Sequence, residues 1–356
     1  MKLFLIGGFL GSGKTTAIQQ ACKQLLKNNT RVAVVTNDQG NMLVDSLFIQ
    51  NSLIPYNEVQ NGCFCCNYDQ FLQSLYRLEK ETSPQIIFAE AVGSCTDIIA
   101  TVAKPLAQLY PKINIVISVF ADASFLHALI KGVSSFSNDN VRYIFQKQIE
   151  EADILILNKA DLLTAEQALQ VEVFIKTQYP DKKILRQNSL EPGSIQQWLS
   201  CLFRIEEVIH RRSLELDYNL YGEGEMQLAW LDASLIINSK KLPVSKVIMQ
   251  LTEDIYNNLK EQQSIIGHIK YFIDDGYEQY KISYTTSGCC DNPSPYPSHK
   301  ASVLINARVQ TQPENLENII RSSIEKISLV TKSGIDIKSL VAFRPGFPKP
   351  THRIAD

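Results

Sequence analysis

Three cysteines lie within four positions of the sequence, at Cys63, Cys65 and Cys66 in the segment VQNGCFCCNYDQF. Their thiolates are soft ligands that suit Zn²⁺, Cu⁺ and similar ions, and a loop can fold all three toward one centre. Three protein ligands leave one position of a tetrahedral site open, which fits a transferable metal better than a closed structural site. The alternative is that the thiols pack as small buried side chains, but their density favours metal binding.

The fourth position of such a site has three candidate occupants, which the sequence alone leaves undecided. They are water, a partner protein and Cys95, the last only if the fold brings it alongside the cluster. A second, weaker metal-site candidate combines Cys289 and Cys290 with His299. Two adjacent cysteines in a loop lack the spacing of a zinc ribbon, so we interpret these three residues first as packing or loop residues.

The segment GFLGSGKT, residues 8–15, fills every fixed position of the phosphate-binding loop and lies between a predicted strand and a predicted helix. Its glycines let backbone N–H groups turn toward phosphates, and the helix N-terminus adds a favourable dipole. We expect Lys14 to reach the β- and γ-phosphates and the Thr15 hydroxyl to bind Mg²⁺. The nucleotide-binding residues predicted in this loop are Gly11, Ser12, Gly13, Lys14, Thr15 and Thr16.

A second nucleotide motif, Asn-Lys-Ala-Asp, ends the hydrophobic segment ILILNKAD. A carboxylate at Asp161 can accept hydrogen bonds from both the ring N1–H and the exocyclic amine of guanine, and adenine offers neither donor there. We expect Asn158 to brace the neighbouring loops and the stem of Lys159 to cover a face of the base. In combination with the upstream phosphate-binding loop, these three residues predict recognition of guanine.

Acidic residues at strand ends complete the predicted nucleotide site. Glu90 ends a buried strand, where such proteins place a carboxylate that holds Mg²⁺ directly or through water. Asp38 and Asp45 follow the second strand, in a segment that could switch with the nucleotide state, although a lone aspartate in a loop is usually a turn former. We therefore predict Lys14, Glu90 and Asp38 as catalytic residues, and Thr15, Asp45 and Glu90 as magnesium ligands.

The elements that must position these residues alternate along the first part of the chain. Continuous apolar segments, which predict strands buried on both faces, lie at 2–7, 31–36, 85–90, 113–120, 152–158 and 182–187. Segments with helical spacing lie at 15–27, 68–80, 141–151, 165–178 and 193–203. Strands alternating with helices predict an α/β domain whose mostly parallel sheet is covered on both sides.

A different pattern follows residue 205. We predict a linker at 206–226, and a smaller α+β domain at 227–356 after the phosphate-binding domain at 1–205. The smaller domain has predicted strands at 228–238, 265–273, 277–285 and 301–309 and predicted helices at 244–262 and 313–329.

The composition of the chain indicates a globular protein and argues against nucleic-acid and membrane partners. The 356 residues are 45% hydrophobic and carry a formal charge of −2, so the chain can bury a sizeable core and shows no basic excess for nucleic acid. The apolar segment at the N-terminus is short and leads into the glycines of the phosphate-binding loop, and no segment reaches the 18 or so apolar residues that span a membrane. We expect a cytoplasmic protein without nucleic-acid or membrane partners, in which clustered thiols stay reduced.

Taken together, the motifs GFLGSGKTT, NDQG, GCFCC, EAVG and NKAD resemble those of the CobW/HypB/UreG family of GTPases, in particular its CobW-like branch of metal chaperones. The resemblance covers about residues 1–205 and rests on the order and combination of the motifs. It implies a P-loop GTPase domain whose nucleotide state gates the handling of a transition metal or metal cofactor.

The resemblance also implies roles for individual residues. It implies that Lys14 and Thr15 bind the phosphates and Mg²⁺, and that Glu90 contacts the water molecules around Mg²⁺. It also implies that Asn158 and Asp161 bind the base. The cargo metal would be bound by Cys63, Cys65 and Cys66. The chain departs from the family pattern at Asp38, where the family usually has glutamate, and at Cys95, where a small or apolar residue is expected. The implied cofactors are Mg²⁺ with GTP and a transition metal, zinc first, with cobalt or nickel as alternatives.

Two functions follow from these observations. The first is a GTP-hydrolysing metallochaperone that binds GTP and GDP and delivers its metal to a client metalloprotein. The sequence leaves open whether the protein forms a homodimer. The alternative is a nucleotide-gated regulatory scaffold that activates a metalloenzyme without carrying metal. An enzyme with a thiolate nucleophile ranks last, because no histidine neighbours the cysteine cluster in sequence.

Overall fold

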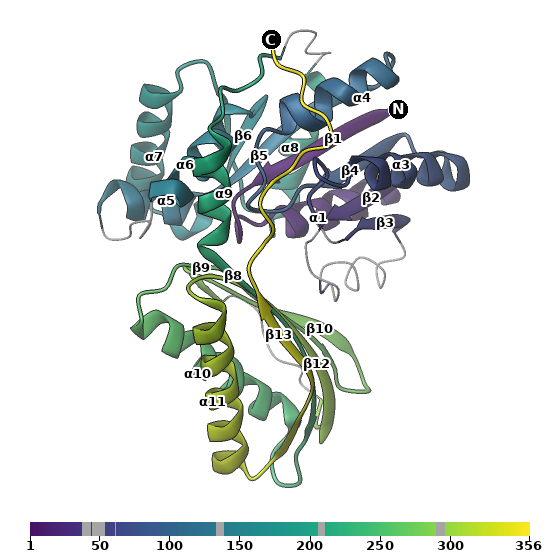
Figure 1. Ribbon diagram of the computed structural model, residues 1–356. Helices are drawn as coiled ribbons and strands as arrows, with labels where there is room; N and C mark the ends of the chain where they lie inside the picture. Colours follow the sequence, from purple (N-terminus) through teal and green to yellow (C-terminus); the bar gives the residue numbers. More distant parts are fainter. Residues whose placement is uncertain (38–43, 45–53, 61, 133–138, 206–210, 290–295) are drawn as a thin grey trace. The chain divides into compact units, whose positions relative to one another are not determined.

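The computed structural model describes residues 1–37, 44, 54–60, 62–132, 139–205, 211–289 and 296–356 (Figure 1). They fall into two compact units. The first unit holds the described residues of Met1–Gln39, Ile49–Gly224 and Phe347–Asp356, and the second holds those of Gly40–Phe48 and Glu225–Gly346.

The first unit is built on a seven-stranded sheet in which all the described pairings are parallel. Its strands, in the order β3-β2-β4-β1-β5-β6-β7, are β3 (Tyr56–Val59), β2 (Val32–Asn37), β4 (Ile86–Glu90), β1 (Lys2–Gly8), β5 (Asn114–Asp122), β6 (Ile154–Asn158) and β7 (Lys183–Arg186). The central strands are buried along almost their whole length, which explains why their sequences are continuously apolar. All carboxyl ends of a parallel sheet lie at one edge, so the loops that follow these strands share that edge.

The first unit also contains helices, several of which pack against its sheet. They are α1 (Lys14–Lys27), α3 (Tyr68–Thr82), α4 (Lys104–Leu109) with a preceding π-helical turn (Ile99–Ala103), α5 (Ala123–Ile130), α6 (Asp139–Glu150), α7 (Ala165–Gln178), α8 (Pro192–Arg204) and α9 (Tyr218–Met226). On the face covered by α1 and α8, the Trp198 ring lies 5.1 Å from the Phe120 ring and 5.9 Å from the Phe88 ring. Local signals start some of these helices: Thr164 forms a capping box with Gln167 at the start of α7.

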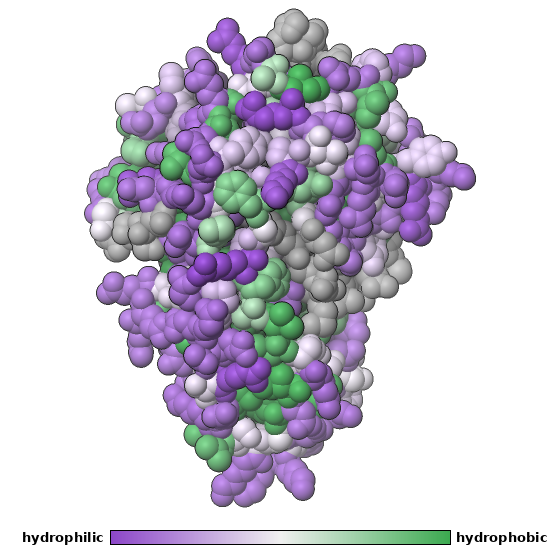
Figure 2. Space-filling view, in the orientation of Figure 1, coloured by the Kyte–Doolittle hydropathy of each residue, from purple (hydrophilic) through white to green (hydrophobic). Residues whose placement is uncertain are grey.

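The described residues of the second unit form a six-stranded antiparallel sheet and the helices α10 (Val244–Glu261) and α11 (Pro313–Thr331). In the order β11-β10-β9-β12-β8-β13, its strands are β11 (Gly288–Cys289), β10 (Gln279–Thr285), β9 (Ile266–Asp274), β12 (Lys300–Gln310), β8 (Leu228–Asn238) and β13 (Gly334–Phe343). Helices α10 and α11 share one hydrophobic core with the sheet. Figure 2 shows hydrophobic side chains along the edge strand β13, where Val341 is 58% exposed.

The predicted fold class is confirmed: a parallel α/β unit carries the phosphate-binding loop, and a smaller α+β unit follows. All six predicted strands of the first unit and all four of the second are present, whereas β3, β11, β13, α4, α5 and α9 lie outside the ranges predicted as strands and helices. The compact units differ from the predicted boundaries in three places. Helix α9 forms the last nine residues of the range predicted as a linker, and Phe347–Asp356 groups with the first unit. Val44, the described residue of Gly40–Phe48, groups with the second unit. No helix in the described part of the chain combines the length and apolar character needed to cross a membrane.

Candidate nucleotide and metal sites

The phosphate-binding loop follows the central strand β1 and approaches its neighbours closely. Gly8 and Gly13 have φ values of 120° and 91°, which side-chain-bearing residues rarely adopt. A Cβ on Gly8 would overlap the Phe120 carbonyl on β5, and a Cβ on Gly13 would overlap the Asn158 amide at the end of β6. Both glycines are therefore required by the backbone conformation and by the lack of space, and the loop is held against the ends of β5 and β6.

Lys14 and Thr15 of the phosphate-binding loop both make buried hydrogen bonds. Lys14 is buried and its Nζ donates hydrogen bonds to the carbonyls of Gly8 at 2.7 Å and Phe9 at 3.2 Å. Thr15 Oγ1 donates to Glu90 Oε1 at 2.8 Å, because the strand register places Glu90 beside Ile6 of β1. A hydroxyl and a carboxylate in contact fit a hard cation such as Mg²⁺, which takes oxygen ligands.

The side chain of Ser12 also indicates how well the loop fits a nucleotide. Its Oγ is buried and has no hydrogen-bond partner among the residues that the structure describes. A buried hydroxyl without a partner costs free energy, and a phosphate oxygen would accept a hydrogen bond from it. The chemistry of the loop thus fits a phosphate.

The guanine motif is positioned at the end of β6 by contacts in three directions. Asn158 is buried; its amide donates to the Ser12 carbonyl at 2.7 Å, and its Oδ1 accepts from the Ser189 backbone N–H at 3.1 Å and from Ser189 Oγ at 2.8 Å. Lys159 has a φ of 59° and forms an ion pair with Asp122 at 2.7 Å. Asp161 lies in the short 3₁₀ turn Ala160–Leu162 with its side chain exposed, so its carboxylate is accessible to a base.

Two predicted site residues lie outside the described part of the chain. Asp38 and Asp45 both fall there, so the structure does not test their assignment to the catalytic and magnesium sites. Asn37 is the last described residue before them, and it ends β2.

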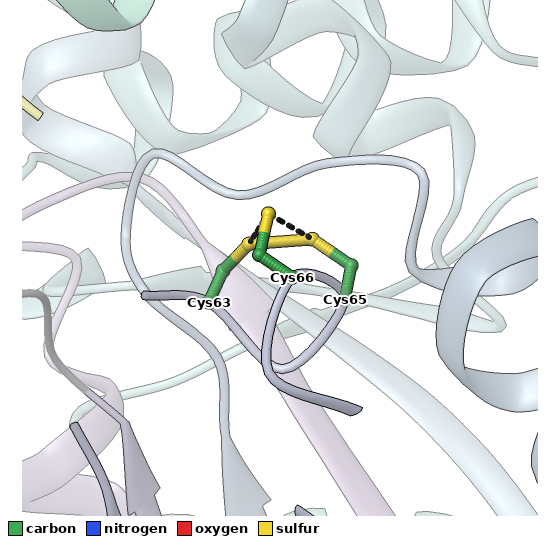
Figure 3. A group of neighbouring side chains, drawn as sticks. All are labelled: Cys63, Cys65 and Cys66. Atoms are coloured by element: carbon green, nitrogen blue, oxygen red, sulfur yellow. Dashed lines mark hydrogen bonds between the residues drawn. A yellow bond between two sulfur atoms is a disulfide. The ribbon is translucent and has the colours of Figure 1, made fainter. Parts of the chain in front are cut away.

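The three cysteines of the GCFCC segment lie together between β3 and α3 (Figure 3). Cys63 and Cys65 are buried and Cys66 is half-buried, and all three Sγ atoms lie within 4.8 Å of one another. The sequence predicted three thiols, but the structure joins Cys63 to Cys65 by a disulfide. The two side chains meet because the turn from Cys63 to Cys66, closed by a hydrogen bond from Cys66 N–H to the Cys63 carbonyl at 3.0 Å, brings their sulfurs together.

The cluster fits a soft metal once that disulfide is reduced, since only thiolates bind such ions. Zinc–sulfur bonds of about 2.3 Å in a tetrahedron place the sulfurs about 3.8 Å apart. Cys65 Sγ lies 3.8 Å from Cys66 Sγ, and Cys66 Sγ lies 3.2 Å from Cys63 Sγ. The spacing therefore needs small side-chain movements to hold a tetrahedral ion.

Cys95, the predicted optional fourth ligand, lies beside the cluster. Its Sγ is 3.9 Å from Cys65 Sγ, close to the edge length of a zinc–thiolate tetrahedron. The Tyr221 hydroxyl lies 3.7 Å from the same sulfur, and Gln148 donates to the Cys95 carbonyl at 2.9 Å. Cys95 is buried on the loop after β4, so the loop that begins at Glu90 also reaches the cysteine cluster.

The second cysteine candidate belongs to the second unit. Cys289 lies on β11 and Cys290 lies outside the described residues. The His299 ring donates through Nδ1 to the Ser239 carbonyl at 3.0 Å, which gives the ring a structural partner. Among the described residues, the metal ligands that cluster in groups of three or more are the GCFCC cysteines, and neither Cys289 nor His299 belongs to such a group.

A polar side chain at the end of β2 holds the cysteine loop. The Asn37 amide donates to the carbonyls of Val59 at 3.0 Å and Gly62 at 2.7 Å, and Asn37 Oδ1 accepts from the Phe64 N–H at 2.9 Å. Asn67 donates to the Gln60 carbonyl at 2.9 Å from the other end of the loop. The loop is thus fixed to the same strand that leads into the predicted switch segment.

Two buried carboxylates lie close to Cys95. Glu151 accepts from the Ile99 N–H at 3.0 Å and from Thr96 Oγ1 at 3.0 Å, and burial, together with the charge of Asp97, raises the pKa of Glu151 to about 8. Asp97 is fully buried with a φ of 65°, and burial raises its pKa as well. A left-handed aspartate in a buried position stores backbone strain, which is typical of functional sites.

The residues that the sequence analysis missed share a position in the fold. Each ends a strand or lies in a loop that follows one at the carboxyl edge of the sheet; they are Asn37, Asp97, Asp122 and Ser189. The signal that could have found them is a polar side chain immediately after a buried apolar segment.

A glycine loop after the central strand of a parallel sheet, with a lysine and a threonine opening the next helix, defines a P-loop nucleotide-binding protein. The sequence model of the CobW/HypB/UreG nucleotide-binding domain matches residues 2–186, which is more than half of the chain. The protein belongs to this family.

Several curated proteins are similar in sequence. Zinc-regulated GTPase metalloprotein activator 1 of Dictyostelium discoideum is 24% identical over 226 residues, covering 53% of this chain and 46% of that protein. Zinc chaperone YeiR of Escherichia coli is 30% identical over 171 residues, covering 47% and 49%. The chain spans about half the length of these relatives. The crystal structure of HypB from Helicobacter pylori in complex with nickel aligns with a TM-score of 0.42 at 15% identity, covering 59% of this chain and 90% of that one.

Proposed function

We propose that the protein is a GTP-hydrolysing metallochaperone that couples its nucleotide state to the binding of a transition metal, zinc first, and to its delivery to a client protein. The observation that carries the proposal is that the phosphate-binding loop and the cysteine cluster lie on one α/β unit and share the loop from Glu90 to Cys95. The relatives, a zinc chaperone and a zinc-regulated GTPase, support the choice of zinc.

On the nucleotide side, Lys14 would neutralise the phosphates, and Thr15 and Glu90 would hold Mg²⁺. Mg²⁺ supplies charge neutralisation for phosphoryl transfer when it is bound. Within this chain, the contact between Thr15 and Glu90 fixes both oxygen ligands before a nucleotide arrives. Asp161 would select guanine, and Asn158 ties the base motif to the phosphate loop through the Ser12 carbonyl.

On the metal side, zinc is the cargo, and Cys63, Cys65 and Cys66 would bind it as thiolates after reduction of the disulfide. Cys95 Sγ lies 3.9 Å from Cys65 Sγ, but Cys95 does not belong to the group of sulfurs that all lie within 4.8 Å of one another, so its side chain would have to move to serve as the fourth ligand. Thiolates at this density fit a reducing compartment such as the cytoplasm.

Coupling between the two sites would run through one short loop and through hydrogen bonds. Glu90 contacts the nucleotide end and Cys95 the metal end of one loop, and Asn37 joins the cysteine loop to the strand before the predicted switch segment. A switch of this kind must favour one state by about 5 kcal/mol to convert it from rare to dominant. GTP would favour one of the two states through its γ-phosphate and the bound Mg²⁺.

Metal analysis of the reduced protein tests the proposal. Prepared anaerobically after reduction, wild type should bind one zinc ion per chain, with an affinity that changes when a non-hydrolysable GTP analogue is added. The triple variant Cys63→Ala, Cys65→Ala, Cys66→Ala should bind none, whereas Cys201→Ala, on α8, should bind zinc as wild type does. Unchanged zinc stoichiometry in the triple variant would contradict the chaperone function.

Hydrolysis is tested separately. Wild type should release phosphate from GTP in the presence of Mg²⁺, and Lys14→Ala should abolish both binding and release. A protein that hydrolyses GTP and activates a metalloenzyme without binding zinc at its cysteines would be the regulatory scaffold instead.

A further inference from the structure

The last ten residues, 347–356, lie along the first unit as an extended segment, which we name the C-terminal strap. In Figure 1 it is the yellow trace that runs past α9 and ends beyond α4. Pro348 is buried, and Gly222 on α9 leaves room for the Phe347 ring, which a Cβ on Gly222 would overlap. The strap is therefore packed against the α/β unit at its start as well as along its length.

The strap makes direct hydrogen bonds to the metal-site cysteines. The Thr351 N–H donates to the Cys65 carbonyl at 2.8 Å, and Thr351 Oγ1 donates to the Cys66 carbonyl at 3.1 Å. The Lys349 N–H donates to Cys66 Sγ at 3.3 Å. A hydrogen bond to the sulfur stabilises its thiolate form, and the two carbonyl bonds fix the backbone between the two cysteines.

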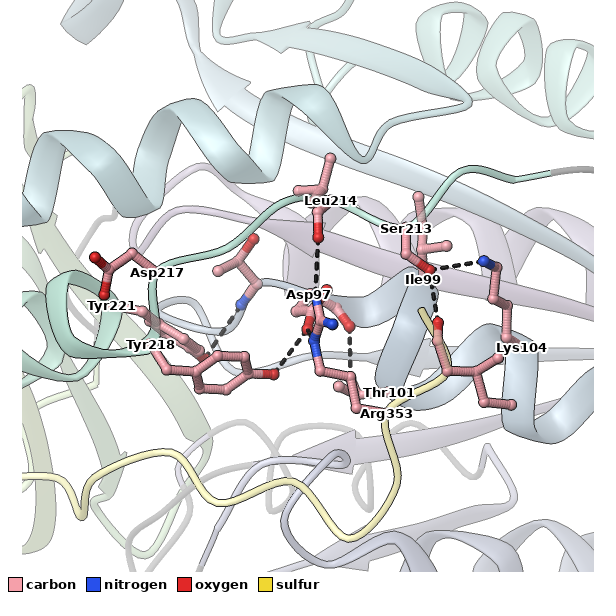
Figure 4. A network of polar contacts seen from close by, with 12 residues as sticks. Asp97, Ile99, Thr101, Lys104, Ser213, Leu214, Asp217, Tyr218, Tyr221 and Arg353 are labelled. Carbon is pink, nitrogen blue, oxygen red and sulfur yellow. Dashed lines mark hydrogen bonds and ion pairs between the residues drawn. The ribbon is translucent and has the colours of Figure 1, made fainter. Parts of the chain in front are cut away.

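Arg353 anchors the strap on the buried Asp97 (Figure 4). Arg353 Nε donates to Asp97 Oδ2 at 2.8 Å, and its second arm donates to the Leu214 carbonyl at 2.8 Å. The Tyr218 hydroxyl donates to the same Asp97 oxygen at 2.7 Å. The Asp97 side chain is fully buried, whereas 30% of the Arg353 side chain is exposed. The ion pair therefore joins a buried group to one that solvent reaches.

Further bonds fasten the end of the strap. The Ile354 N–H donates to the Ala100 carbonyl at 2.9 Å, Ser213 Oγ donates to the Ile354 carbonyl at 2.7 Å, and Lys104 forms an ion pair with Asp356. The ring of His352 packs edge-on against the Tyr68 ring at 5.0 Å.

The position of the anchor links the strap to both functional sites. Asp97 lies two residues after Cys95, on the loop that starts at Glu90 of the magnesium site. A movement of this loop would therefore act on Arg353 and on the cysteines that the strap contacts.

We propose that the C-terminal strap is a working part of the metal site: it positions Cys65 and Cys66 and covers them, and Arg353 is the positioning residue that holds it in place. With the strap docked, the thiols are shielded and the metal is retained. With Arg353 released from Asp97, the Cys66 end of the site opens to a client. This inference rests on the proposed metal-binding function, but the shielding of the thiols is testable without any metal.

Two measurements on the reduced full-length protein test the strap. The first is the rate of thiol modification by a small reagent in the metal-free protein, mapped to Cys65 and Cys66 by peptide mass spectrometry. The second is the rate of zinc transfer to an excess of a coloured chelator. Arg353→Ala should raise both rates about tenfold, the size expected for the loss of a charged hydrogen bond of about 1.4 kcal/mol. Co²⁺ bound in place of zinc should show a changed thiolate charge-transfer band in the same variant.

Matched variants separate positioning from general destabilisation. Arg353→Lys keeps the charge and should restore most of the wild-type rates, whereas Arg321→Ala, at an exposed arginine on α11, should leave them unchanged. Thr351→Pro removes both the N–H and the hydroxyl that contact Cys65 and Cys66 while Arg353 stays in place, so it should also raise both rates.

Each outcome decides a different claim. If the thiols of both Arg353→Ala and Thr351→Pro are modified at wild-type rates, the proposed role of the strap is wrong. If wild type binds no zinc, the proposed function fails, and the thiol rates alone then decide whether the strap shields the cysteines. In a third outcome the variants bind zinc and their thiols react faster than those of wild type, but zinc is released at the wild-type rate. The strap then does not control metal transfer, and the inference is wrong.

Discussion

Asn37 Oδ1 accepts a hydrogen bond from the Phe64 backbone N–H at 2.9 Å, which fastens the middle of the GCFCC segment to the end of strand β2. The same side chain donates to the Gly62 carbonyl at 2.7 Å. One asparagine therefore binds the cysteine loop through both its donor and its acceptor. Because Asn37 immediately precedes the predicted switch residue Asp38, this contact connects the start of that segment to the loop that carries the predicted metal ligands.

Replacing Asn37 should loosen the cysteine loop and leave the phosphate loop intact. Asn37→Ala removes three hydrogen bonds to loop backbone, each with a net contribution of about 1 kcal/mol. We expect zinc affinity of the reduced protein to fall at least about tenfold and to lose its response to a GTP analogue. GTP affinity itself should change by less than about twofold, because the P-loop contacts remain. Competition titrations against a zinc chelator, with and without the analogue, measure both effects.

A matched control for that variant is Asn57→Ala. Asn57 lies on β3 and its amide donates to the Ser74 carbonyl at 3.1 Å, away from the cysteine turn. Its zinc affinity and nucleotide response should equal those of wild type. An Asn37→Ala protein with unchanged zinc affinity and an intact GTP response would show that the loop does not depend on this residue.

Removal of the Thr15 hydroxyl should abolish the magnesium dependence of nucleotide binding. Thr15→Val keeps the shape of the side chain but loses the oxygen that contacts Glu90 at 2.8 Å and would bind Mg²⁺. We expect GTP affinity in Mg²⁺ to fall to the level that wild type shows in EDTA, and Thr15→Ser to restore most of the difference. Titrations of a fluorescent GTP analogue in both buffers give the answer. A Thr15→Val protein that still binds GTP more tightly with Mg²⁺ would contradict the assignment.

The sequence predicted the parts of the site that lie in short contiguous motifs. Lys14 and Thr15 belong to one loop, Asn158 and Asp161 to another, and in each case residue type and spacing carry the chemistry without knowledge of the fold. The parallel sheet was predictable for a similar reason, because strands buried on both faces are continuously apolar.

The remaining parts depend on contacts between distant segments. Arg353 and Asp97 are 256 residues apart, and nothing in the sequence near either residue indicates the other. Strand β3 is short and mostly half-buried, so it lacks an apolar run. In β13 the alternation of exposed and half-buried residues is broken at Ser339 and Leu340, just after a register shift between Ile337 and Ser339, which hides the period-two signal of an edge strand.

Asp161→Asn should change which base the protein prefers. An asparagine amide can still accept from N1–H but presents an N–H donor where guanine has its amine, whereas xanthine has an accepting carbonyl at that position. We expect affinity for GTP to fall by about 10- to 100-fold and affinity for xanthosine triphosphate to rise. Asp181→Asn, at an exposed loop position, should leave both affinities unchanged. Equal affinity of wild type for ATP and GTP would contradict guanine recognition by this motif.

Glu151 should make the first unit less stable as pH rises toward 8. Burial raises its folded-state pKa to about 8, whereas an unfolded glutamate titrates near 4.5. Between these values the folded state binds more protons than the unfolded state, so the free energy of unfolding falls with increasing pH, by up to about 1.4 kcal/mol per pH unit. Below pH 4.5 both states are protonated, and above pH 8 both are ionised, so the contribution of Glu151 is then constant.

Glu151→Gln should remove that dependence, because the amide can accept from the Ile99 N–H and donate to Thr96 Oγ1 without titrating. Urea unfolding at pH 5.5, 6.5 and 7.5 measures the slope, with Trp198 reporting the first unit in a Trp230→Phe background. The variant should gain stability relative to wild type as pH rises, and Glu81→Gln, at an exposed ion pair, should run parallel to wild type. Parallel curves for wild type and Glu151→Gln would mean that Glu151 is ionised in the folded protein across this range, with its charge balanced by the N–H and hydroxyl donors around it.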